Sequence, residues 1–201
     1  MYTTYTLVKK AASVTALCLG LVLSGTAFAG PGKPGNNDFV DGGSIVAVAL
    51  KVNADTGEFS NLLAAVQCFG PLEDNPVVDL LNGKKRHTLF APTDEAFAAL
   101  LGRLGETDPC DIDLATLLTV LQYHVVSGRR FSNSLFDPYE AKEIATLAGV
   151  DIISYVDPEF GPMLHDVDGQ MVGVVDGLIN INASNGVIHV VDTVLLPIDL
   201  P

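Results

Sequence analysis

The chain has 201 residues with 11 basic and 24 acidic side chains, so its formal net charge is −13. This length suits one domain with a single core. So negative a chain would be repelled by nucleic acid and by an anionic membrane surface, and neither is expected as a partner. Because 17% of the residues are charged and 48% are hydrophobic, most of the chain is expected to fold.

Residues 1–29 have the pattern of a secretory signal peptide. Two lysines precede an apolar stretch at 11–23, and Ala-Phe-Ala at 27–29 provides the small-x-small pattern that signal peptidase needs. The apolar stretch is too short to predict a membrane span, although a retained interfacial anchor is the alternative. We therefore expect cleavage near Ala29 and Gly30. The mature protein would be secreted, periplasmic or at the cell surface, with no membrane span.

The mature chain is expected to be a monomeric single domain. Residues 1–29 contain two lysines and no acid, so the other 172 residues carry 9 basic and 24 acidic side chains and a net charge of −15. That charge should resist nonspecific association. Residues 30–42 are rich in glycine, proline and asparagine and are expected to be a flexible lead-in. The domain is expected at 43–197, with a short tail at 198–201.

Helical patterns dominate the first half of this domain. Ser44 is a suitable N-cap for the apolar run that follows it. A short buried strand is predicted at 88–91 and ends at Pro92. Thr93 can then cap a helix whose first turn carries Asp94, which complements the helix dipole. The run capped by Ser44, at 45–50, is expected to be helical, and apolar residues predict further helices at 60–69, 77–81 and 114–123.

Beyond Gly128 the pattern changes to short β-rich segments separated by turns. The pairs Asp168-Gly169 and Asn185-Gly186 are strong turn signals. Because helices come first and strands second, the sequence predicts an α+β domain rather than a doubly wound sheet. The predicted strands are 150–156, 163–167, 170–175, 178–181 and 187–195.

Cys68 and Cys110 are the two cysteines of the mature chain. An even number of cysteines in an exported protein favours a disulfide. The bridge would close a loop of about forty residues and contribute on the order of 4 kcal/mol. Two separate buried thiols are the alternative. Neither cysteine lies in a CxxC motif or at a zinc-finger spacing from a histidine, so no metal site is predicted.

Three segments, taken together and in order, resemble the conserved blocks of fasciclin-type domains. They are residues 87–97 (HTLFAPTDEAF), 123–128 (YHVVSG) and 185–197 (NGVIHVVDTVLLP). The resemblance extends over 43–197 and is to a single-domain, exported, bacterial-like member. It implies a fasciclin-like β-wedge or sandwich with flanking N-terminal helices. It also implies a role in cell adhesion or matrix interaction, in a family that is not generally enzymatic.

Most residues of these blocks have a structural interpretation. Phe90 and Phe97 are expected in the core, and Gly186 allows a tight turn. Ile188, Val190, Val194 and Leu196 alternate and are expected to fill one face of a strand. The residues assigned to structural motifs are Phe90, Pro92, Thr93, Asp94, Phe97, Asn185, Gly186 and His189.

The pair Tyr123 and His124 has two interpretations. A histidine at the end of an apolar helix is typically a buried group hydrogen-bonded to the backbone, and we favour this interpretation for His124. In some animal relatives the tyrosine–histidine region has been linked to integrin recognition. By that resemblance Tyr123 and His124 are the candidate binding residues.

Known catalytic patterns are missing from the sequence. It contains no GxSxG, HExxH, P-loop or GxGxxG motif, and its four histidines are widely separated. The acidic run at 165–169 has Leu164 where a calcium loop needs its first ligand, and no glutamate follows at the right distance. A hairpin turn is therefore expected there. No enzyme activity, cofactor or catalytic residue is predicted.

Three hypotheses about function follow. The favoured one is an exported adhesion or matrix-interaction module that binds a cell-surface or matrix protein or polysaccharide. The alternative is a carrier of a small apolar ligand such as a carotenoid, which Phe131, Phe136 and Phe160 would permit. A hydrolase is the third, and it would need a serine or carboxylate to meet a histidine in a cleft.

Overall fold

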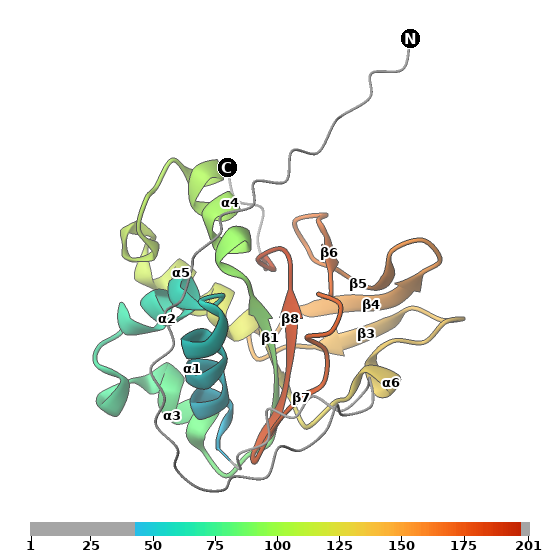
Figure 1. The fold of residues 1–201 in the computed structure, drawn as a ribbon. Coiled ribbons are helices and arrows are strands. Elements are labelled where there is room, and N and C mark those ends of the chain that lie inside the picture. The colour runs from blue at the N-terminus through green and yellow to red at the C-terminus, as the bar shows by residue number, and fades with distance from the viewer. Residues whose placement is uncertain (1–42, 198–201) are drawn as a thin grey trace, which may run out of the picture. The chain divides into compact units, whose positions relative to one another are not determined.

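A computed structural model describes residues 43–197 (Figure 1). The expected signal peptide, lead-in and tail lie outside the described residues. The described part contains six α-helices and two four-stranded sheets, which confirms the predicted α+β class. None of its helices is long and apolar enough to cross a membrane.

The helices of the first half begin and end where local capping groups allow. Ser44 Oγ accepts a hydrogen bond from the Ala47 N–H, and Thr93 Oγ1 accepts one from the Ala96 N–H, so both predicted N-caps are confirmed. The elements are α1 (Ile45–Thr56), α2 (Ser60–Gln67), η1 (Leu72–Asp74), α3 (Pro76–Asn82), α4 (Asp94–Leu104), η2 (Pro109–Asp111) and α5 (Leu114–Tyr123).

The first sheet has the strand order β2-β1-β8-β7. Its central strands β1 and β8 run parallel, with Phe90 opposite His189. Every residue of these two strands is buried, because the sheet is covered on both faces. The strands are β1 (His87–Pro92), β2 (Val125–Ser127), β7 (Ile181–Ala183) and β8 (Gly186–Val191).

The second sheet is an antiparallel meander of the order β3-β4-β5-β6. A short helix, α6 (Ser132–Leu135), precedes it. The strands are β3 (Lys142–Ala145), β4 (Asp151–Asp157), β5 (Gly161–His165) and β6 (Met171–Gly173).

Two hydrophobic clusters hold these layers together. One lies between the helices and the first sheet and includes Phe97 and Ile188. The other lies between the two sheets and includes Phe90 and Leu164. In Figure 1 the first sheet accordingly runs between helices α1–α5 on one side and the second sheet on the other. Both phenylalanines therefore occupy the core, as expected.

Some sequence expectations were wrong in detail. The predicted strand 88–91 is present as β1 and is one residue longer at each end. The predicted strand 187–195 ends at Val191, because the chain bends where Asp192 Oδ1 accepts a hydrogen bond from the Gly173 N–H. The predicted strand 178–181 is a turn up to Asn180, whose φ is 63°, and β7 begins only at Ile181. Strands β2 and β3 and helix α6 were missed.

Candidate functional site

Tyr123 and His124, the candidate binding residues, lie in the interior. Their side chains are 0% and 1% exposed. The Tyr123 hydroxyl donates a hydrogen bond to the carbonyl oxygen of Asp151 at 3.0 Å. Burial raises the pKa of Tyr123 to about 12, because the charged phenolate is disfavoured away from water. Tyr123 therefore connects the end of α5 to the start of β4.

His124 is hydrogen-bonded to the backbone through both ring nitrogens. Nδ1 lies 2.7 Å from the carbonyl oxygen of Val120, and Nε2 lies 3.0 Å from the backbone nitrogen of Leu195. Because a carbonyl only accepts and an N–H only donates, the ring is neutral with its proton on Nδ1. Burial lowers the pKa of His124 to about 4. These contacts favour the structural interpretation over direct recognition of a partner.

His189 is also bonded to the backbone, in the opposite tautomer. Its Nε2 lies 2.9 Å from the carbonyl oxygen of Arg130, and its Nδ1 accepts a hydrogen bond from the Asn180 N–H. Burial lowers its pKa to about 4. The ring of His87 is buried, and neither of its nitrogens has a hydrogen-bond partner among the described residues. Burial lowers the pKa of His87 as well, and the positive charge of Lys85 lowers it further. None of these rings is hydrogen-bonded to a carboxylate or hydroxyl of the described residues, as a general base would need.

The other motif residues join elements together. Asn185 Oδ1 accepts a hydrogen bond from the Ile45 N–H, and its Nδ2 donates to the carbonyl oxygen of Leu81, so β8 is tied to α1 and α3. Asp94 Oδ1 accepts a hydrogen bond from the Asn61 N–H at 2.7 Å, which ties α4 to α2. Pro92 is the last residue of β1.

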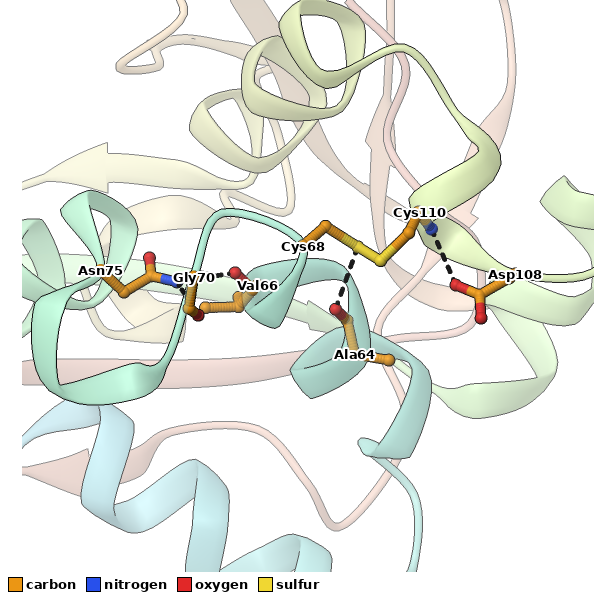
Figure 2. The surroundings of a disulfide bond; sticks show 7 residues. All are labelled: Ala64, Val66, Cys68, Gly70, Asn75, Asp108 and Cys110. Atoms are coloured by element: carbon orange, nitrogen blue, oxygen red, sulfur yellow. Dashed lines mark hydrogen bonds between the residues drawn. A yellow bond between two sulfur atoms is a disulfide. The ribbon is translucent and has the colours of Figure 1, made fainter.

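A disulfide joins Cys68 to Cys110, across 42 positions of sequence (Figure 2). It links the end of α2 to η2, where Asp108 Oδ1 accepts a hydrogen bond from the Cys110 N–H at 2.9 Å. Possible metal donors of Cys68, Asp108 and Cys110 lie within 4.8 Å of one another. Because both sulfurs are in the disulfide, neither is a thiolate that could bind a metal.

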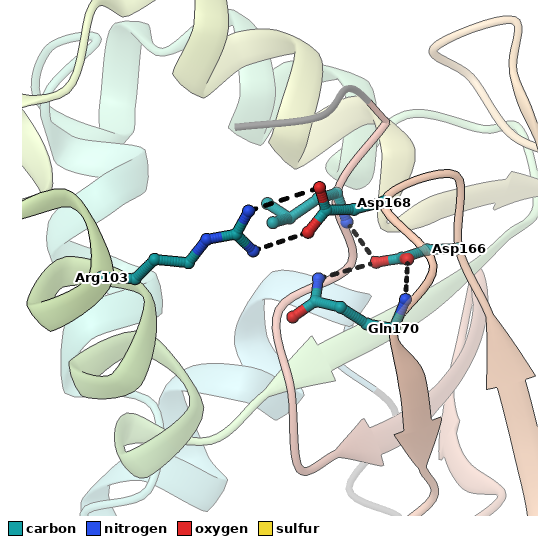
Figure 3. A network of polar contacts seen from close by, with 5 residues as sticks. Arg103, Asp166, Asp168 and Gln170 are labelled. Atoms are coloured by element: carbon teal, nitrogen blue, oxygen red, sulfur yellow. Dashed lines mark hydrogen bonds and ion pairs between the residues drawn. The ribbon is translucent and has the colours of Figure 1, made fainter. Parts of the chain in front are cut away.

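The acidic run is a hairpin turn between β5 and β6, as expected (Figure 3). Asp166 is 3% exposed and both of its oxygens accept protein hydrogen bonds, from the Gln170 N–H and side-chain amide and from the Leu196 N–H. Arg103 reaches from α4 to pair with Asp168, with Nη1 and Oδ2 2.6 Å apart. The carboxylates of this turn therefore hold the C-terminal segment and α4.

Two hollows in the described part differ in chemistry. An apolar cavity of about 40 Å³ lies among α1, α2, α3 and α5. Ligand pockets usually measure about 300–1,000 Å³, so this cavity is too small for a carotenoid. An open groove of about 700 Å³ lies at the start of α4, and its lining includes Glu58, Glu95 and Asp192.

One face of the second sheet is exposed, and sequence reasoning missed it. Leu164 and Val172, opposite each other in β5 and β6, are both buried against the first sheet. The alternate residues therefore point the other way. The face that they form, called the outer face below, carries Ile153, Tyr155, Met163, His165 and Met171.

The outer face is ordered by the strand register. Ile153 lies opposite His165, which lies opposite Met171, and Tyr155 lies opposite Met163. Ile153 is 39% and Met171 67% exposed. The same face also has acidic positions around these residues, at Glu143, Asp151 and Asp157. The alternation within residues 163–173 was the signal that could have revealed it.

The Fasciclin domain model matches residues 57–197, the region that holds both sheets. This chain belongs to the fasciclin domain family. The fold also resembles that of a FAS1 domain pair from the insect cell adhesion molecule fasciclin I, with a TM-score of 0.55 and 17% identity. That match spans 70% of this chain and 46% of the other, and it supports the fold alone.

Relatives of known sequence include both bacterial and animal proteins. Protein sll1483 of Synechocystis sp. is 33% identical over 150 residues, which are 74% of this chain and 72% of that protein. Cell surface glycolipoprotein MPT83 of Mycobacterium tuberculosis is 30% identical over 62% of this chain and 49% of its own length. Transforming growth factor-beta-induced protein ig-h3 of Sus scrofa is 30% identical over 76% of this chain but only 20% of its own length.

Proposed function

We propose that this fasciclin-domain protein is an exported, non-catalytic adhesion module that binds a cell-surface or matrix protein through its outer face. The proposal rests on the positions of the exposed apolar side chains. Seven large apolar side chains are exposed in the described part, and five of them come from the second sheet and its loops. Exposed apolar side chains are typical of binding surfaces, which are enriched in aromatic residues and methionine. Ile153 and Met171 lie on the outer face, and the other three, Tyr139, Phe160 and Val167, lie in loops before or between the strands of the second sheet.

Charge around the outer face indicates the kind of partner. Glu143 lies opposite Ile153 on this face, and Asp151 and Asp157 share it. A second copy of the chain would bring the same carboxylates together, and the full chain has a net charge of −13. A partner with an apolar centre and a rim of lysine or arginine is complementary to this arrangement. Because the exposed side chains of Ile153 and Met171 on the outer face are apolar, we favour a protein over a polysaccharide.

Two further observations support a binding role. The relatives include a protein named for the cell surface. The rings of His87, His124 and His189 are buried, and the last two are held by backbone bonds. Partly exposed His165 has no serine or carboxylate opposite it in the sheet, where its neighbours are Ile153 and Met171.

The experiment measures attachment of beads coated with the full chain to cells of the source organism. The test variant combines Ile153→Thr with Tyr155→Ser, which removes an apolar group that is 39% exposed and a partly exposed aromatic ring of the outer face. The control is Leu114→Thr, which removes an apolar group that is 49% exposed at the start of α5. We expect saturable attachment that weakens with salt, persists in the control and is lost in the test variant.

The other outcomes count against the proposal in distinct ways. Attachment that survives protease treatment of the cells would identify a polysaccharide and overturn the protein partner. Equal attachment of the test variant and the control would exclude the outer face. No attachment above an acidic control protein of similar charge would remove the adhesive role.

A further inference from the structure

Two thioethers and one imidazole lie at neighbouring positions of the outer face. Met163 and His165 are two residues apart in β5, so their side chains leave the same side of the strand. Met171 lies directly opposite His165 in the register of β5 and β6. Residues directly opposite have Cβ atoms about 4.5–5.5 Å apart, and diagonal neighbours about 7–8 Å. The long methionine side chains can span these separations, so their sulfurs and the ring can converge on one ion.

Packing does not occupy these donors. Met171 is 67% exposed, and Met163 and His165 are partly exposed. No hydrogen bond to either ring nitrogen of His165 is found among the described residues, whereas His124 and His189 use both of theirs. Met163 and Met171 are also the two methionines of residues 43–197. The core therefore gives no reason for this combination.

The chemistry of the donors selects the ion. Thioether sulfur is a soft ligand that prefers Cu(I), while imidazole also binds copper. Hard cations such as Ca²⁺ and Mg²⁺ require oxygen ligands, and zinc sites use imidazole, thiolate or carboxylate. The nearest carboxylate in the row of His165 is Glu143, on the far side of Ile153.

The charge of the surroundings favours binding of a cation. Gly173, opposite Met163, has no side chain, and a Cβ there would overlap the Asp192 carboxylate. The whole chain is strongly acidic, with a net charge of −13. Negative charge near an exposed site raises the local concentration of cations.

We propose that Met163, His165 and Met171 bind Cu(I) on the outer face, with two sulfurs and one ring nitrogen as ligands. This site goes beyond the adhesive role and needs no partner protein. Its failure would leave the attachment assay unaffected, and loss of attachment would leave the metal titration unaffected.

The test is an anaerobic titration of the full chain against the coloured Cu(I)–bicinchoninate complex. Cys18→Ser is included in every protein, so that this thiol does not compete, while the disulfide removes the other two. We expect one Cu(I) withdrawn per chain. Combined Met163→Leu and Met171→Leu should weaken the binding by about tenfold or more, and so should His165→Gln. Phe160→Leu, at an exposed position without a donor atom, is the matched control.

A second measurement identifies the ligands directly. Ag(I) is a redox-inert substitute for Cu(I), and we expect it to shift the methyl NMR signals of Met163 and Met171, while Zn(II) leaves them in place. Thermal unfolding of each variant verifies that the fold is intact. Equal Cu(I) affinity in the parent and both ligand variants would overturn the site. Zn(II) binding at the same residues with equal affinity would overturn the choice of metal.

Discussion

The imidazole of His124 accepts a hydrogen bond from the backbone N–H of Leu195 at 3.0 Å, and this joins α5 to the segment that follows β8. The other ring nitrogen is bonded to Val120, one turn earlier in α5. Residues 71 positions apart are thus linked by one neutral, buried side chain. Both nitrogens are used, so His124 contributes to stability rather than to a binding surface.

His124→Ala should lower the free energy of unfolding by about 1–3 kcal/mol. The Leu195 N–H would lose its acceptor inside the core, and a buried donor without a partner is costly. Urea unfolding of the full chain measures the change. His165→Ala, on the outer face, is the control and should stay within about 0.5 kcal/mol of the parent. Unchanged stability of His124→Ala together with lost cell attachment would contradict the structural interpretation.

Stability should fall as the solution is acidified below pH 6.5. Burial lowers the pKa of His124 and of His189 from 6.5 to about 4, so both rings are neutral in the folded state. Between these values the unfolded chain binds protons that the folded chain excludes. The free energy of unfolding is therefore highest above pH 6.5. It falls between pH 6.5 and pH 4, by about 1.4 kcal/mol per pH unit for each ring. Urea unfolding across this range should show a shallower slope for His189→Gln, and parallel curves for variant and parent would contradict the assignment.

Local signals in the sequence predicted much of the helical half. Ser44 and Thr93 cap helices through bonds to residues three positions later, and such contacts depend on nearby sequence alone. The parallel pairing of β1 with β8 joins residues about 100 positions apart, and no turn signal marks it. Strand β2 has three residues and β3 four, so neither is long enough to show a clear alternation.

For the candidate site too, nearby sequence predicted some features, while others depend on contacts between residues far apart in the chain. The position of His124 at the end of an apolar helix predicted a backbone-bonded ring, but its bond to Leu195 depends on tertiary structure. The outer face requires the register between β5 and β6, which places Met171 beside His165. In the sequence alone these residues are separated by the hairpin turn. The chemistry of their side chains was visible there, but their proximity was not.

Removing the disulfide should destabilise the protein by on the order of 4 kcal/mol. The bond between Cys68 and Cys110 spans 42 positions, and a loop of that length restricts the unfolded chain strongly. The combined variant Cys68→Ala and Cys110→Ala, compared with the parent in urea, measures this contribution. Non-reducing peptide mapping of exported protein provides the check. Recovery of both residues as free thiols would exclude the bond in the natural protein.

Gly186→Ala should be among the most damaging single changes, costing about 3 kcal/mol or more. A Cβ at Gly186 would overlap the carbonyl oxygen of His87 in the paired strand β1 and the side chain of Ile45. Gly102→Ala is the matched control, because it lies in α4 and its Cβ would meet no atom within 4 Å. We expect that control to stabilise the helix by up to about 1 kcal/mol. Similar unfolding free energies for the two variants would contradict this close approach of the strands.

The stability of the β5–β6 turn should depend more on Asp166 than on the ion pair between Arg103 and Asp168. Asp166 accepts the buried Leu196 N–H and two bonds from Gln170, so Asp166→Ala leaves a core donor without a partner and should cost about 2–3 kcal/mol. Asp166→Asn retains an acceptor oxygen and should cost less. Because these hydrogen bonds are inside the protein, the stability lost in Asp166→Ala should change little with salt. The effect of Arg103→Gln should instead shrink at high salt, since that side chain is 36% exposed. Urea unfolding at low and high salt separates the two, and equal losses for Asp166→Ala and Asp166→Asn would show that the Leu196 bond is unimportant.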